Sequence, residues 1–193
     1  LIIDMMDYLA YHNETRLQKL KNIVDKYSIR YDFAYRLRTL EGFDIVMIID
    51  DSSSMCTPVI DYKANMSPFG HIPTRWDELR QTVSIVVDLA GTLTTEGIDI
   101  FFLNRQPIFQ VTDSSQLHET FSQLPNGSSP IAKMLSHVFN LKRSRIYDRK
   151  LLCFIATDGL PTDENGRNDL DGFEKVLRNE RYPSIDRMRV TFI

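Results

Sequence analysis

Two unbroken apolar runs, each ending in acidic and hydroxyl side chains, constrain this chain more than any other feature. The run Ile45 to Ile49 has no charge and no glycine and leads directly into Asp50-Asp51-Ser52-Ser53-Ser54-Met55. The run Leu151 to Ala156 leads into Thr157-Asp158-Gly159. A strand buried on both faces of a parallel sheet needs continuous apolar character rather than alternation. The runs therefore predict two central strands, and ligand sites in open α/β sheets lie beyond the carboxyl ends of such strands.

The rest of the chain supplies the other layers of such a fold. Apolar periodicity predicts helices at 15–27, 32–40, 76–90, 114–124, 131–138 and 172–179, and further strands at 98–103, 107–111 and 188–193. Asp32 is expected to cap the second helix, and Pro130 to occupy the first position of the fifth. Pro107 places its strand at a sheet edge. The order of elements predicts an α/β, three-layer, Rossmann-like fold with a mostly parallel sheet and helices on both faces.

Length and composition indicate one globular core. The chain has 193 residues, of which 42% are hydrophobic, so one sizeable core is expected. We expect a short N-terminal helical extension, residues 1–42, followed by one domain, residues 43–193. Residues 57–73 hold four helix and strand breakers, which predicts a surface loop. Because the chain starts at Leu1 and stops at Ile193 inside an apolar run, we expect a piece of a longer protein.

Charge and cysteine content exclude several classes of partner and compartment. The net charge is −3, which gives no electrostatic reason to expect nucleic acid or a membrane surface as a partner. No run is long enough to span a bilayer, and the first ten residues do not resemble a signal peptide. With only two cysteines, Cys56 and Cys153, we expect no disulfide framework, and we expect Cys153 to be a buried thiol. We expect an intracellular, cytoplasmic protein.

The polar residues after the strands form a candidate metal site. If the two central strands are neighbours, Asp50 and Asp158 lie at the same edge of the sheet, where the hydroxyls of Ser52, Ser54 and Ser129 can approach them. All of these donors are oxygens, which suit Mg²⁺ first and Mn²⁺ or Ca²⁺ as alternatives, and argue against zinc. The four histidines show no paired ligand spacing. Two carboxylates would neutralise a divalent ion and leave a position for water or an incoming carboxylate.

Each of these side chains also has an ordinary structural interpretation. Serine and aspartate in loops more often cap helices or form turns than bind metal, and Ser129 before Pro130 is a good helix cap without any ion. Caps do not explain why two acids end two apolar strands with a hydroxyl loop between them, so we favour the metal site. Asp51, Thr157 and Asp163 are expected to lie behind the ligands or in solvent.

These motifs resemble the von Willebrand factor type A family and its metal-ion-dependent adhesion site. The family has Asp-x-Ser-x-Ser after the first strand, which is intact at Asp50 to Ser54, and a Thr-Asp-Gly segment, which matches Thr157 to Gly159. Its middle element is a threonine before a proline, and here Ser129 takes that place. The resemblance covers residues 44–193 and implies that the family's last helix and strand are absent. It also implies metal ligation by Asp50, Ser52, Ser54, Ser129 and Asp158.

Three functions are compatible with these residues. The resemblance implies a non-enzymatic, metal-dependent protein-binding module in which a partner's Asp or Glu completes the Mg²⁺ shell. An alternative is a Mg²⁺-dependent phosphoryl-transfer enzyme with Asp50 as nucleophile, although Ser52 stands where haloacid-dehalogenase-type enzymes require a second acid and no glycine-rich phosphate loop is present. A third is a structural module whose site stays empty.

Overall fold

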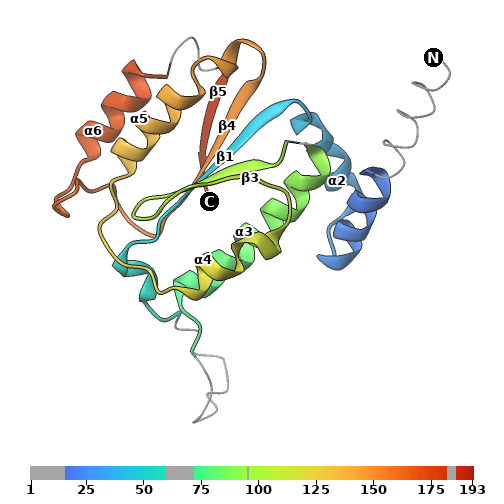
Figure 1. Cartoon of the computed structure of the whole chain (residues 1–193), viewed down its shortest axis with the longest axis horizontal. Helices are drawn as coiled ribbons and strands as arrows, with labels where there is room; N and C mark the ends of the chain where they lie inside the picture. Colours follow the sequence, from blue (N-terminus) through green and yellow to red (C-terminus); the bar gives the residue numbers. More distant parts are fainter. Residues whose placement is uncertain (1–15, 60–71, 95, 182–185) are drawn as a thin grey trace.

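A five-stranded, mostly parallel sheet forms the centre of the protein (Figure 1). The computed structural model describes residues 16–59, 72–94, 96–181 and 186–193. Its strands are β1 (Phe43–Ile49), β2 (Ile98–Phe102), β3 (Ile108–Val111), β4 (Lys150–Ala156) and β5 (Met188–Phe192). They lie in the order β3-β2-β1-β4-β5, and only β3, at the edge, is antiparallel to its neighbour. The predicted α/β class, the mostly parallel sheet and the edge position of the third strand are confirmed.

The two strands that the apolar runs predicted are direct neighbours. β1 and β4 pair in parallel along their whole length, with Ile49 opposite Ala156, so both strands end at the same level. The amide of Asp50 continues the ladder by donating to the Ala156 carbonyl at 2.9 Å. The chain leaves β1 toward β2 on one side and reaches β4 on the other, so the strand order reverses between them. Open α/β sheets bind ligands at such a switch point.

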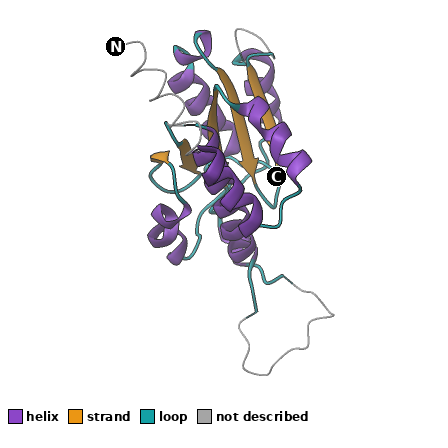
Figure 2. Cartoon of the chain, turned by 90° about the vertical axis from the view of Figure 1, so that its right-hand side faces the viewer, coloured by secondary structure: helices purple, strands orange, loops and turns teal. Residues whose placement is uncertain are grey.

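Helices cover both faces of the sheet. The described part of the chain contains α2 (Tyr31–Leu37), α3 (Arg75–Leu93), α4 (His118–Ser122), α5 (Ile131–Lys142) and α6 (Leu170–Asn179), with short 3₁₀ turns η1 (Arg38–Leu40), η2 (Ser53–Cys56), η3 (Ser114–Leu117) and η4 (Arg145–Tyr147). Residues 16–26 are also helical. Helices α3 and α4 lie on one face, and α5 and α6 lie on the other (Figures 1 and 2). The chain is therefore three layers thick.

The core is divided by the sheet into two apolar clusters. On one side, Val83 and Val87 of α3 pack with Met47 of β1. On the other side, Leu135 and Val138 of α5 pack with Val46 and Ile48 of β1. Residues 45–49 are all buried, because successive side chains of a strand point to opposite faces and both faces are covered. This double burial explains why the run is apolar without alternation. Cys153, in β4, is buried as predicted, and burial raises the pKa of its thiol to about 12.

Three predicted helix boundaries are wrong. Asp32 lies within the first turn of α2, where it accepts hydrogen bonds from Arg30, and so does not precede the helix as a cap. Pro130 is the N-cap of α5 and not its first helical residue. The helix predicted at 114–124 is divided into η3 and α4 and ends at Ser122, which leaves Leu124 80% exposed. The last two differences arise from contacts with other loops, described below.

Helix α3 begins at a capping box that fixes its first turn. Thr74 is the N-cap, its hydroxyl accepts from the Asp77 amide, and the Asp77 carboxylate accepts from the Thr74 amide. Most of the loop predicted at 57–73 lies outside the described residues, but its two ends are paired by the Pro58–Thr74 bridge and by the bond from the Val59 amide to the Pro73 carbonyl.

Among the described helices, none combines the length and apolar character needed to cross a bilayer.

Candidate metal centre

Three loops meet at the carboxyl ends of β1 and β4. Residues 50–56 follow β1, residues 125–130 precede α5, and residues 157–163 follow β4. They are joined by backbone hydrogen bonds: the Ser53 amide donates to the Gly127 carbonyl at 3.1 Å, and the Thr162 amide donates to the Ser129 carbonyl at 2.9 Å. The loops are thus held as one unit at the switch point of the sheet.

Asp50 is the centre of this unit. Its Oδ1 accepts from the Ser52 amide at 2.9 Å and from the Ser129 hydroxyl at 3.4 Å, and its Oδ2 accepts from the Thr157 hydroxyl at 2.6 Å. The residue is 1% exposed. Among the described residues, no lysine, arginine or histidine forms an ion pair with Asp50. A buried carboxylate is normally paired with a cation or bound to a metal, so this one is suited to a cation from outside the chain.

A second line of oxygens leads from Ser52 toward the surface. The Ser52 and Ser54 hydroxyls lie 2.9 Å apart, and the Ser54 hydroxyl donates to Asp158 Oδ1 at 2.9 Å. Ser52 is buried, whereas Ser54 is exposed. The alternate positions of Asp-x-Ser-x-Ser therefore do face the same side of the turn after β1, as the spacing predicts.

Ser129 does not cap the helix that follows it. The N-cap of α5 is Pro130, which has no side chain that can accept from the helix. The Ser129 hydroxyl points instead to Asp50, and its amide donates to the Thr162 hydroxyl at 2.9 Å. The structural alternative for Ser129 is therefore wrong, and the hydroxyl remains available to a ligand.

Asp158 lies near the surface and is paired with a basic side chain. Its Oδ2 accepts a hydrogen bond from the Arg75 guanidinium, at the first residue of α3. The Asp158 side chain is 10% exposed and that of Arg75 is 45% exposed. A positively charged group thus already lies beside one of the two carboxylates.

Asp51 points away from these oxygens and into a separate network. Its Oδ1 accepts from the backbone amide of Asn104 at 2.8 Å and from the Asn104 side chain at 3.2 Å. Arg105 Nε forms an ion pair with Oδ2 at 3.1 Å, and this oxygen accepts no hydrogen bond from the described residues. The side chain is fully buried. Burial raises the pKa of Asp51, and the hydrogen bonds from Asn104 and the charge of Arg105 oppose the rise.

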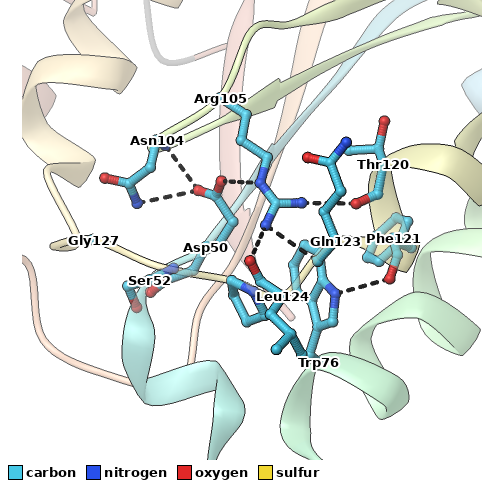
Figure 3. Close-up of polar contacts among 12 residues, drawn as sticks. Asp50, Ser52, Trp76, Asn104, Arg105, Thr120, Phe121, Gln123, Leu124 and Gly127 are labelled. Carbon is cyan, nitrogen blue, oxygen red and sulfur yellow. Dashed lines mark hydrogen bonds and ion pairs between the residues drawn. The ribbon is translucent and has the colours of Figure 1, made fainter.

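Arg105 extends this network to the loop after α4. Its guanidinium donates to the Thr120 carbonyl at 2.7 Å and to the Leu124 carbonyl at 2.6 Å, and lies 5.2 Å from the ring centre of Trp76 (Figure 3). Trp76 itself is buried against Phe121. Arg105 therefore holds the carbonyls of Thr120, Gln123 and Leu124, the last two of which lie beyond the end of α4 at Ser122, and it fixes the chain where the helix ends and Leu124 is exposed.

Sequence reasoning missed Asn104 and Arg105. The signal was present, because both lie within three residues of the end of β2 at Phe102, next to the end of β1, and parallel neighbours end at one edge. The network also restricts the middle loop. Gly127 has φ of +115°, and a Cβ there would lie 2.3 Å from Asn104 Oδ1, so this position requires glycine.

Asp163, like Asp51, is a predicted candidate that lies apart from the cluster. Its carboxylate accepts from the amides of Asn165 and Arg167 within its own turn, each at 2.8 Å. These hydrogen bonds, with that of the Arg167 amide the strongest, lower its pKa. Asp163 therefore shapes the loop after β4 and makes no described contact with Asp50 or Asp158.

The donor set fits a hard divalent cation. It consists of two carboxylates and three serine hydroxyls, with the Thr157 hydroxyl beside them, and oxygen donors are those that Mg²⁺, Mn²⁺ and Ca²⁺ prefer. Among the described residues, no three or more His, Cys, Asp or Glu side chains are grouped so that they could hold a metal ion, so this candidate centre depends on serine hydroxyls beside its two carboxylates. The residues that would hold the ion are Asp50, Ser52, Ser54, Ser129 and Asp158.

Compared with known proteins, the sequence matches no protein-family model and no curated protein.

Proposed function

We propose that this chain is a von Willebrand factor type A domain that binds a partner protein through a metal-ion-dependent adhesion site. A divalent cation, Mg²⁺ in the first place, is held by the two carboxylates and three serines of the candidate centre. An Asp or Glu of the partner completes its coordination. The observation that carries the proposal is that Asp50 is buried without a basic partner among the described residues, while it accepts from the Ser52 amide of its own loop and from the Ser129 and Thr157 hydroxyls of the two other loops.

The charges of the site support an acidic partner. Asp50 and Asp158 together balance a divalent ion, and the hydroxyls of Ser52, Ser54 and Ser129 add no charge. The bound ion is then left with a position that an external carboxylate can fill, since hard cations of this size take six or more oxygens. In this site the cation supplies the electrostatic attraction for the partner's acid.

The surroundings of Asp50 favour a ligand over a nucleophile. Both carboxylate oxygens already accept hydrogen bonds from the protein, and the residue is 1% exposed. A nucleophilic carboxylate must reach the reacting atom of a substrate. We therefore propose a binding function without turnover.

Panning a phage-displayed random peptide library on the immobilised chain tests this function. Peptides should bind in Mg²⁺, be released by EDTA and be enriched in Asp or Glu. The Asp50→Ala variant, checked for an unchanged far-ultraviolet circular dichroism spectrum, should retain none of them. Asp171→Asn, which removes an exposed acid at the start of α6, is the matched control and should behave as the wild type. Peptides that resist EDTA, or that bind the Asp50→Ala variant equally, would contradict the proposal.

A further inference from the structure

Arg75 is paired with Asp158, a carboxylate that a divalent cation would also bind. It is the first residue of α3, and its guanidinium donates to Oδ2 of Asp158, a proposed metal ligand. Among the described residues, Asp158 is its only ion-pair partner. The other acid beside the cluster, Asp51, already has its own arginine, Arg105. Arg75 is thus the basic side chain that acts on the ligands themselves.

The backbone of Arg75 is anchored while its side chain is free to move. The capping box of Thr74 and Asp77 fixes the turn, and the Arg75 amide donates to the Thr57 carbonyl at 3.0 Å. The side chain is 45% exposed, so the guanidinium can leave Asp158 for solvent without breaking buried contacts. The backbone of Arg75 therefore stays fixed while its guanidinium can move from Asp158 into solvent.

We propose that Arg75 is a built-in competitor for the metal ion, which occupies Asp158 in the cation-free state and is displaced when the cation binds. This inference rests on the proposed function, because it assumes that Asp158 is a ligand. With Arg75 in place, the two carboxylates and the guanidinium together carry a net charge of −1, whereas the two carboxylates alone carry −2. The displacement costs the ion pair and adds repulsion between the ion and the arginine, so metal affinity is set below what the oxygens alone would give.

Isothermal titration calorimetry with Mg²⁺ tests the competition. Arg75→Gln should bind Mg²⁺ about 3- to 30-fold more tightly than the wild type, which corresponds to removal of one partly exposed ion pair together with a nearby like charge. Arg75→Lys keeps the charge and should stay close to the wild type. Arg80→Gln removes the same charge from an exposed position of α3, where it has no described ion pair, and should leave the affinity unchanged.

The outcomes separate this inference from the function on which it rests. If the wild type binds Mg²⁺ and Arg75→Gln binds it equally or more weakly, the competition is refuted and the metal site stands. If Arg80→Gln gains as much affinity as Arg75→Gln, the effect is one of general charge and the competition is again refuted. If neither the wild type nor Arg75→Gln binds Mg²⁺ or Mn²⁺, the metal site and the competition are both refuted.

Discussion

Each acid at the carboxyl edge of the sheet has a different electrostatic partner. Asp51 is paired with Arg105 in the interior, Asp158 is paired with Arg75 at the surface, and Asp50 has hydroxyl and amide donors but no described base. Asp50 and Asp51 are adjacent in sequence and both buried, yet only Asp50 faces the oxygens of the other loops. Their roles therefore differ: Asp50 is suited to bind a cation, and Asp51 holds the loops in place.

Removal of Arg105 should destabilise the fold. In Arg105→Ala the Asp51 carboxylate stays buried without its cation, and the carbonyls after α4 lose their donors. Breaking a buried ion pair from one side costs about 3–5 kcal/mol of unfolding free energy. Urea denaturation followed by circular dichroism measures this loss.

The control for that variant is Arg178→Ala. Arg178 pairs with Glu174 on the exposed face of α6, and such pairs contribute little. Its unfolding free energy should stay close to that of the wild type. If Arg105→Ala loses no more stability than Arg178→Ala, Arg105 does not hold the loops together.

At the scale of elements, Asp88 connects the helix at 16–26 to the sheet domain. It lies on α3, and its carboxylate accepts from Lys26 Nζ at 2.9 Å, from the Tyr27 hydroxyl at 2.7 Å and from the Ser114 amide at 3.0 Å. Burial opposes ionisation, but these three donors outweigh it and lower the pKa of Asp88. One carboxylate therefore links the N-terminal helix, α3 and η3.

This contact predicts a pH dependence of stability. Because the pKa of Asp88 is lower in the folded chain than its ordinary value of 3.8, ionised Asp88 stabilises the fold above that value. The contribution is lost as the pH falls through the folded-state pKa. Urea unfolding from pH 7 downward should show wild type more stable than Asp88→Asn near neutral pH, with the difference shrinking below about pH 4. A difference that is constant with pH would show that the charge of Asp88 is not involved.

The positions of the elements could be predicted from the sequence, but some of their ends could not. The apolar runs of β1 and β4 and the stripe of α3 are periodic patterns set by burial, and such patterns are local. The chain at the end of α4 is held by Arg105, which donates to the carbonyls of Thr120, Gln123 and Leu124, and the start of α5 follows the turn of Ser129 toward Asp50. These contacts join residues far apart in the chain, so no local pattern contains them.

The candidate site was predictable to a similar extent. The spacing in Asp50-x-Ser52-x-Ser54 and the acid after β4 indicated which oxygens would meet, because parallel neighbours end together. The partner of Asp158 was not predictable, because Arg75 starts a helix and nothing in its neighbourhood in sequence connects it to β4. Asp51 was expected to lie in solvent or behind the ligands; it is buried, and its pairing with Arg105 was likewise not predictable.

At the scale of the whole molecule, the two ends of the sheet differ in how their acids are neutralised. At the amino end, the buried Lys142 lies 3.0 Å from Asp44 and 2.6 Å from Asp99, so those acids have a cation supplied by the chain. At the carboxyl end, Asp50 has no such cation among the described residues. The molecule therefore has one end that is complete in itself and one end that is suited to an external ion.

We propose that the loops after β1, before α5 and after β4 form a single cation site. The most direct measurement is a Mg²⁺ titration of the ¹⁵N-labelled chain followed by ¹H–¹⁵N correlation spectra. The amides of Ser52, Ser54, Ser129 and Gly159 should shift together with one common dissociation constant, and Gly97 at the opposite end of the sheet should not move. In the Asp50→Asn variant these shifts should be absent. Absence of shifts in the wild type, or shifts that saturate at different concentrations in the three loops, would contradict the claim.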